Sequence, residues 1–293
     1  MRSWRRLIII LKYLFYRGDV FKNIKRHFQL IKVLRPFGAQ GLINNKTYII
    51  YLFSYISRSL NVPTKFQCLI HHYSFLKNLF SEKQLYHLLK KGIECYKEIS
   101  DGDEYTIILT SSTSLEIDGS LTLLFKINNI KIANLSFTIV PGKAFDVDEE
   151  HIIYISGLQR TGNQVNNIKK AIDHFVDITP AVILLKSLES FGLFLGINKL
   201  LGITAANQLS FGYTGDYDKY YAVYDEFWEL NGGKLINDSY VIPCPIPQKD
   251  ILLIKQTHRN RARKKRQKLS EISAECSYNI KQALACENDD DIP

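Results

Sequence analysis

The chain has few cysteines and none of the short motifs that mark common catalytic centres. Its five cysteines are odd in number, widely spaced and include no Cys-x-x-Cys pair: Cys68, Cys95, Cys244, Cys276 and Cys286. This pattern predicts neither a disulfide framework nor a zinc knuckle, and it favours a reducing compartment. A serine nucleophile elbow, a phosphate-binding P-loop and internal repeats are also absent. No metal site is therefore expected, and any chemistry must come from other residues.

The sequence also lacks a continuous apolar run long enough to cross a bilayer, which needs about 20 residues. The apolar residues 7–11 and 13–16 are separated by Lys12 and flanked by Arg5, Arg6 and Arg17. The interruption and the missing small-residue cleavage site argue against a signal peptide. Two interpretations of this N-terminal segment remain. It is either an ordinary helix docked on the protein or a basic amphipathic helix lying on anionic lipid.

Acidic residues are scarce at both ends of the chain. Residues 1–47 hold eleven Lys/Arg against one Asp, and residues 249–270 hold nine against one, whereas the whole chain carries a net charge of +9. Such asymmetry predicts that the ends contact an anionic surface, either a membrane leaflet or nucleic acid. Residues 258–269 contain no aromatic for base stacking, so nucleic acid is disfavoured. We expect a cytoplasmic protein that associates peripherally with the inner membrane.

Hydrophobic periodicity predicts an α+β protein, with a helical N-terminal region followed by a mixed, mainly antiparallel sheet flanked by helices. Residues 1–100 show helical spacing, including a segment at 82–98. Turn signals at Asp118-Gly119 and Asn128-Asn129 predict hairpins. The expected strands are 105–110, 113–117, 121–127, 130–140, 151–156, 201–205 and 239–243, and the expected later helices are 165–176, 180–195 and 221–230. The predicted domains are 1–100 (helical), 101–255 (α/β) and 256–293 (basic helix and acidic tail).

The segment after residues 151–156 is the best candidate for chemistry. Gln159-x-x-Gly162 is expected in a loop between a buried strand and a helix, where free N–H groups favour an anion such as a pyrophosphate, and Arg160 adds charge. The alternative is a strand-to-helix turn without a ligand. The order of elements resembles the Gcn5-related N-acetyltransferase (GNAT) layout, in which a Gln/Arg-x-x-Gly-x-Gly/Ala loop cradles acyl-CoA. Gln164 departs from that pattern.

The GNAT resemblance implies an acyl-CoA or other acyl donor as cofactor, and a tyrosine on the last helix that protonates the leaving thiolate. In this sequence that residue is Tyr221 or Tyr224, since a phenol can act as a general acid. The competing interpretation is that the aromatic side chains of this helix belong to the core.

A set of short segments suggests a second resemblance. They are Gly157-Leu158-Gln159, Pro180-Ala181-Val182-Ile183-Leu184-Leu185, Leu201-Gly202-Ile203, Tyr224-Asp225-x-Phe227-Trp228-x-x-x-Gly232-Gly233, Val241-Ile242-Pro243 and the basic run after Asp250. Together they resemble the VirK/YbjX family of Gram-negative bacterial proteins. That resemblance implies a role in virulence, envelope stress and resistance to antimicrobial peptides. Two hypotheses follow: an acyltransferase-like enzyme acting on an envelope component at the inner leaflet, or a non-catalytic factor that binds a membrane or a protein through its basic ends.

Overall fold

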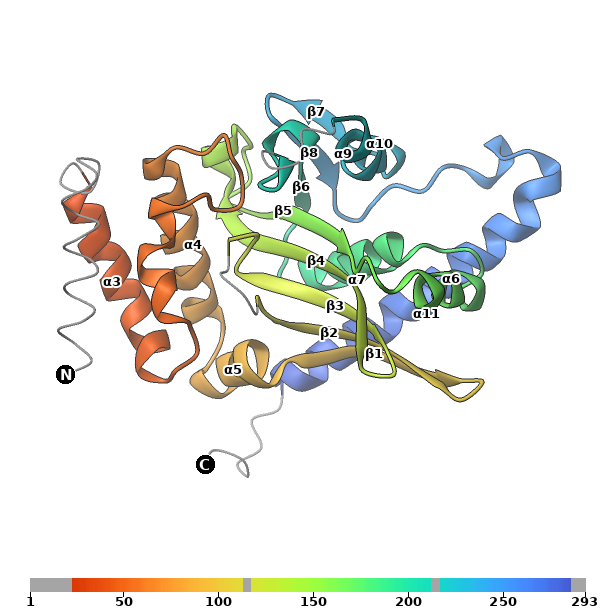
Figure 1. Cartoon of the computed structure of the whole chain (residues 1–293), viewed down its shortest axis with the longest axis horizontal. Helices are drawn as coiled ribbons and strands as arrows, with labels where there is room; N and C mark the ends of the chain where they lie inside the picture. Colours follow the sequence, from red (N-terminus) through yellow and green to blue (C-terminus); the bar gives the residue numbers. More distant parts are fainter. Residues whose placement is uncertain (1–22, 113–116, 212–216, 286–293) are drawn as a thin grey trace.

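The computed structural model describes residues 23–112, 117–211 and 217–285, and it is built around one eight-stranded sheet (Figure 1). The strand order is β1-β2-β3-β4-β5-β6-β8-β7. All neighbouring pairs are antiparallel except β5 and β6, which are parallel. The strands are β1 (Ile93–Ser100), β2 (Asp103–Ser111), β3 (Leu121–Ile127), β4 (Ile130–Pro141), β5 (His151–Arg160), β6 (Lys199–Ile203), β7 (Lys234–Ile236) and β8 (Ser239–Pro243). The α+β class and the mainly antiparallel sheet are confirmed.

Helices pack on and around this sheet. They are α3 (Ile24–Ala39), α4 (Val62–Leu79), α5 (Glu82–Tyr86), α6 (Val165–His174), α7 (Pro180–Phe194), α9 (Tyr217–Val223), α10 (Asp225–Leu230) and α11 (Gln256–Ala285), with shorter helical turns η1 (Asn45–Leu52), η2 (His87–Lys91), η3 (Gly142–Phe145), η4 (Ala205–Asn207) and η5 (Ile251–Leu253). The helices α7 and α11 pack against each other, α7 contacts β3 and β4, and α11 contacts β1. On the other side of Figure 1, α3 packs on α4, which contacts β4.

The hairpin between β3 and β4 forms where turn chemistry predicts it, whereas Asp118-Gly119 lies in a longer connection, because Ser111 of β2 pairs directly with Leu121 of β3. Asn128 and Asn129 both have positive φ, 49° and 63°, the conformation of a two-residue turn that matches strand twist. The predicted strands at 105–110, 121–127, 130–140 and 239–243 are confirmed. The predicted strand at 113–117 and the predicted N-terminal helix fall largely or wholly outside the described residues, as does the acidic tail.

Two predicted boundaries are wrong. The helical segment predicted at 82–98 ends at Gly92, whose φ of 80° breaks the helix, and β1 then pairs with β2 along residues 93–100. The loop predicted at 157–160 is instead the end of β5, because β4 continues alongside it and pairs Asn134 with Gln159. The three-part domain division stays a prediction. Its first boundary lies in the turn between β1 and β2.

No helix within the described part of the chain is both long and apolar enough to cross a membrane. The longest, α11, spans 30 residues but carries most of the basic run. Its inner side is fastened to the sheet, because Lys268 contacts Glu98 of β1 at 2.8 Å and Asn279 donates a hydrogen bond to the carbonyl of Cys95 at 3.0 Å. Part of the basic helix α11 is therefore packed against the sheet and is not accessible to a partner.

Candidate functional site

The parallel strands β5 and β6 separate at the centre of the sheet. Their pairing joins Ile153 to Leu200, Tyr154 to Leu201 and Ile155 to Gly202, and it stops there. β6 ends at Ile203, whereas β5 continues to Arg160 with β4 as its partner on the other side. Residues 156–160 of β5 therefore present an edge that β6 does not cover.

Tyr224 lies against this edge. The Leu158 N–H donates a hydrogen bond to the Tyr224 hydroxyl at 3.3 Å, and the same hydroxyl lies 3.4 Å from the Leu158 carbonyl oxygen. The side chain is buried, and burial raises the pKa of the phenol well above its usual value. The helix predicted at 221–230 breaks at Tyr224 into α9 and α10, where φ is −110° and ψ is −70°. The break directs the phenol toward the backbone of β5.

Trp228 makes the corresponding contact with β6. It is fully buried, and its indole N–H donates a hydrogen bond to the Ile203 carbonyl at 2.8 Å. The ring lies so close to Gly202 that a Cβ at that position would come within 2.5 Å of it. Glycine is therefore required at 202 because the indole occupies the space that any side chain would fill.

Asp225 completes the attachment. Its carboxylate accepts a hydrogen bond from the Ala205 N–H at 2.6 Å just after β6, and burial raises its pKa. Gly232 ends α10 with a φ of 81°, the left-handed conformation that glycine adopts readily at the end of a helix. The Tyr-Asp-x-Phe-Trp segment thus connects β5 to β6 at the point where the two strands diverge.

A groove with a volume of about 930 Å³ opens beside this point. Its walls come from β4, β5, the start of α7, and α9–α10: Ala133, Leu158, Gln159, Arg160, Thr179, Ala181, Val182, Ser210, Tyr220, Ala222, Val223, Tyr224, Phe227, Leu230 and Asn231. More than half of these side chains are apolar, and the polar ones come from the end of β5, the start of α7, the segment before α9, and α9–α10. Such a groove suits an elongated ligand with an apolar body and polar or charged ends.

Three of the five predicted site residues line this groove: Gln159, Arg160 and Tyr224. Tyr221 and Gly162 do not line it. Tyr221 lies on α9 with 38% of its surface exposed, and a Cβ on Gly162 would meet open space. The helix whose N-terminal residues reach the groove is α7, not α6, because β5 extends to Arg160 and carries the following loop past it.

Several polar groups of the site were missed by sequence reasoning. The Gln159 amide lies 3.4 Å from a carboxylate oxygen of Asp118, and burial raises the pKa of Asp118. Tyr220 donates a hydrogen bond to Ser210 at 2.9 Å, and its ring stacks on Tyr224. The order of residues could not indicate these contacts, since they join the β2–β3 connection to β5 and the segment before α9 to α9 itself.

Gln208 is fully buried beside these groups. Its amide oxygen accepts a hydrogen bond from the Ser210 hydroxyl. Burial raises the pKa of the Tyr224 phenol, and a hydrogen bond with the Gln208 side chain partly opposes this increase. Gln208 therefore connects Ser210 with Tyr224 beside the groove.

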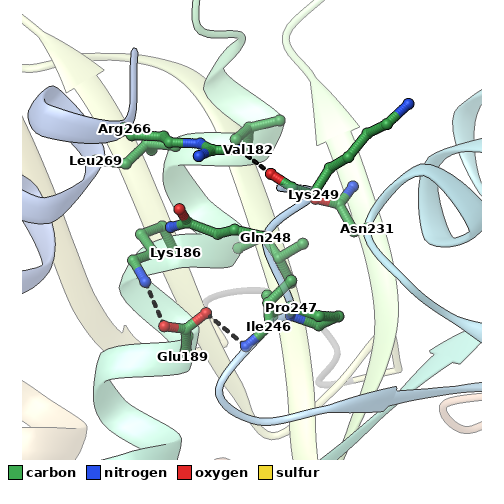
Figure 2. A pocket seen from close by; sticks show the side chains of 11 residues that line it. Val182, Lys186, Glu189, Asn231, Ile246, Pro247, Gln248, Lys249, Arg266 and Leu269 are labelled. Carbon is green, nitrogen blue, oxygen red and sulfur yellow. Dashed lines mark hydrogen bonds and ion pairs between the residues drawn. The ribbon is translucent and has the colours of Figure 1, made fainter. Parts of the chain in front are cut away.

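A smaller pocket of about 210 Å³ adjoins the groove and shares Val182 and Asn231 with it. Figure 2 shows the Glu189 carboxylate between the Lys186 ammonium and the Ile246 N–H. The carboxylate accepts a hydrogen bond from this N–H at 3.0 Å. Arg266 donates to the carbonyl oxygen of Lys249, whose own ammonium points away. Because Glu189 offsets the charge of Lys186, the net positive charge of this adjoining pocket comes from Arg266 and Lys249.

No group of three or more His, Cys, Asp or Glu residues that could hold a metal ion occurs in residues 23–112, 117–211 and 217–285. Several of the histidines contact other rings instead. His71 and His151 lie 3.0 Å apart between ring nitrogens, and His174 stacks on Tyr105.

Fold and site together define an α+β protein with a single mixed sheet whose central parallel strands diverge beside an apolar groove. The chain belongs to the family described as "Protein of unknown function (DUF535)", whose model matches residues 2–277. A relative in Escherichia coli (strain K12), "Uncharacterized protein YbjX", is 24% identical over 226 residues, which cover 74% of this chain and 67% of the relative. The VirK/YbjX resemblance is thereby confirmed. No solved structure matches.

Proposed function

We propose that this protein is an acyltransferase-like enzyme that binds an acyl thioester, acyl-CoA or another acyl donor, in the groove between β5 and α9–α10. The observation that carries the proposal is the groove of about 930 Å³ beside the end of β5, lined by Gln159, Arg160 and Tyr224. A mostly apolar groove with a few polar groups suits an elongated ligand such as an acyl chain with a polar head. The order of the elements, including a parallel strand pair followed by a tyrosine-bearing helix, supports the GNAT-like layout.

The residues fit such a donor in part. The groove offers an apolar body, Arg160 at one end and the cations of the adjoining pocket at the other. The Gln159-x-x-Gly162 cradle fits less well, because Gln159 and Arg160 belong to β5 and Gly162 does not line the groove. We therefore place the anionic end of the donor near the start of α7 and the basic pocket. There Thr179, Ala181 and Val182 present the helix N-terminus, which favours negative charge.

Calorimetry with acetyl-CoA and longer acyl-CoA thioesters tests this proposal. We expect binding with a Kd between about 1 µM and 1 mM, the usual range for enzyme substrates. Ala222→Trp fills the groove from an exposed position and should weaken binding at least about tenfold, since the ligand would have to displace the ring. Ala274→Trp, at an exposed position on α11, is the matched control. Thioester binding that is absent, or equal in both variants, would refute the proposal.

Tyr224 would then act as the proton donor to the leaving thiolate. The phenol is protonated through the neutral range, as an acid requires, although burial raises its pKa and makes it a weaker proton donor than an exposed phenol. Tyr224→Phe should lower the rate of thiol release from acyl-CoA by about 10²-fold or more, measured with an inner-membrane lipid extract as the acceptor source. Tyr221→Phe is the matched comparison, and a loss confined to Tyr221→Phe would assign the role to Tyr221 instead.

The acceptor, in this proposal, is a cell-envelope component reached at the inner leaflet, and the effect on envelope stress, virulence or antimicrobial peptide resistance follows from its modification. If the groove binds no thioester, the non-catalytic hypothesis takes its place. The protein would then act through its basic surfaces alone.

A further inference from the structure

Two neighbouring leucines are exposed on the turn that precedes α11. Leu252 and Leu253 of η5 have 68% and 70% of their surface exposed. We call these two residues the leucine turn. The leucine turn lies between β8 and α11 in the chain. In Figure 1 it is next to the end of the blue helix α11 that lies farthest from the C-terminus. Adjacent leucines left in water are unfavourable unless they have a partner.

The N–H groups of residues 252–254 and the carbonyls of Leu252 and Ile254 are hydrogen-bonded within the protein. The Asp250 carboxylate accepts the Leu252 N–H at 2.9 Å, and the Asp250 and Ile251 carbonyls accept the next two N–H groups at 3.1 and 3.2 Å. The Arg259 guanidinium donates to the carbonyls of Leu252 and Ile254, each at 2.9 Å. A backbone whose polar groups are already paired can leave water without the penalty that unpaired groups carry.

The surroundings of the leucine turn are strongly basic. Residues 249–268 contain nine Lys/Arg and one acid, Asp250, a net charge of 9 − 1 = +8. Some of these cations already form ion pairs with acidic residues of the protein, as Arg261 does with Asp177 at 2.7 Å. Lys249, Lys255 and Lys264 are exposed and form no ion pair with the described residues. Asp250 is the N-cap of η5, and its carboxylate is hydrogen-bonded to the Leu252 N–H of the turn.

We propose that the leucine turn inserts into the headgroup boundary of an anionic phospholipid bilayer, while Lys249, Lys255 and Lys264 contact the lipid phosphates. Charge complementarity selects this partner, because anionic lipid attracts clustered Lys/Arg while the apolar tip gains from leaving water. The proposal does not depend on the acyl-transfer proposal. Thioester binding is measured without vesicles, so the acyl-transfer proposal and the membrane proposal can each be refuted without affecting the other.

Vesicle flotation with the full chain tests the leucine turn. Phosphatidylcholine vesicles containing phosphatidylglycerol should bind the protein, and neutral phosphatidylcholine vesicles should bind it much less. Leu252→Ser/Leu253→Ser should weaken binding to the anionic vesicles by about tenfold or more, since two apolar side chains no longer insert. The control Ile99→Ser/Ile130→Ser, which removes side chains 69% and 47% exposed elsewhere, should bind like the unchanged protein.

A fluorescent label separates insertion of this turn from binding by the N-terminal segment. The described cysteines are buried, so a Leu253→Cys variant in a Cys286→Ser background takes an environment-sensitive dye at position 253. Its emission should shift to the blue on anionic vesicles. Unchanged binding of the double serine variant, no shift of the bound dye, or equal binding to neutral vesicles would overturn the proposal. A loss of self-association without a loss of vesicle binding would assign the turn to a second copy and overturn it too.

Discussion

Replacing Trp228 with alanine is expected to lower the free energy of unfolding by about 4 kcal/mol, the range for deleting a fully buried large aromatic. The indole is completely buried, packs over Gly202 and donates a hydrogen bond to Ile203. Its loss leaves a cavity between α10 and β6 and an unpaired carbonyl. Urea unfolding of the two proteins, monitored by circular dichroism, measures the difference.

Two further variants show whether the contact itself is responsible. Trp228→Phe keeps most of the ring but loses the hydrogen bond, so about half of the effect is expected. Gly202→Val should also destabilise strongly, because a Cβ there would come within 2.5 Å of the indole. A loss below about 1 kcal/mol for Trp228→Ala would contradict the packing argument, since so small a value is typical of surface positions.

Acidification is expected to destabilise the protein through His71 and His72 of α4. His72 is fully buried, and burial lowers its pKa to about 3, while burial and the neighbouring His151 lower the pKa of His71 to about 4. Below the ordinary histidine pKa of about 6.5, the unfolded chain binds these protons and the folded chain does not. Stability is therefore complete above pH 6.5 and falls as the pH is lowered toward 4. His72 alone contributes roughly 1.4 kcal/mol per pH unit in that window.

The variant His72→Gln tests the assignment. The Nδ1 of His72 accepts the Ile139 N–H at 3.2 Å, and a glutamine amide oxygen can take over this role without binding a proton. The free energy of unfolding, measured from pH 7 to pH 4, should lose part of its slope in this variant. His258→Gln, at an exposed position of α11, controls for the removal of a histidine. An unchanged slope in His72→Gln would show that acid sensitivity arises elsewhere.

Local sequence patterns predicted most of the sheet. The meander from 105 to 140 follows from alternating apolar residues and from turn pairs such as Asn128-Asn129, because hairpins are set by neighbours in the chain. β1 was missed, since residues 93–100 also fit helical spacing and become a strand through pairing with β2. The three-residue strand β7 carries too few residues for a periodic signal.

For the candidate site, the sequence identified the right segments without their arrangement. Gln159, Arg160 and Tyr224 were selected from local motifs, and all three line one groove. Which helix reaches that groove could not be predicted, because it depends on how far β5 runs beside β4. Asp118 and Gln208 reach the site from segments distant in sequence, and no local pattern reports such contacts.

The family, the α+β class and the basic character of residues 249–270 follow from composition, hydrophobic period and short motifs, all of which are local properties of the chain. The separation of β5 and β6 after Ile155, and the contacts of Tyr224 and Trp228 with these two strands, arise only when distant segments pack together. The tertiary structure also decided that Leu252 and Leu253 stay exposed while neighbouring cations are used inside the fold. Strand pairing and burial depend on which distant segments come into contact. A local sequence pattern does not specify those contacts.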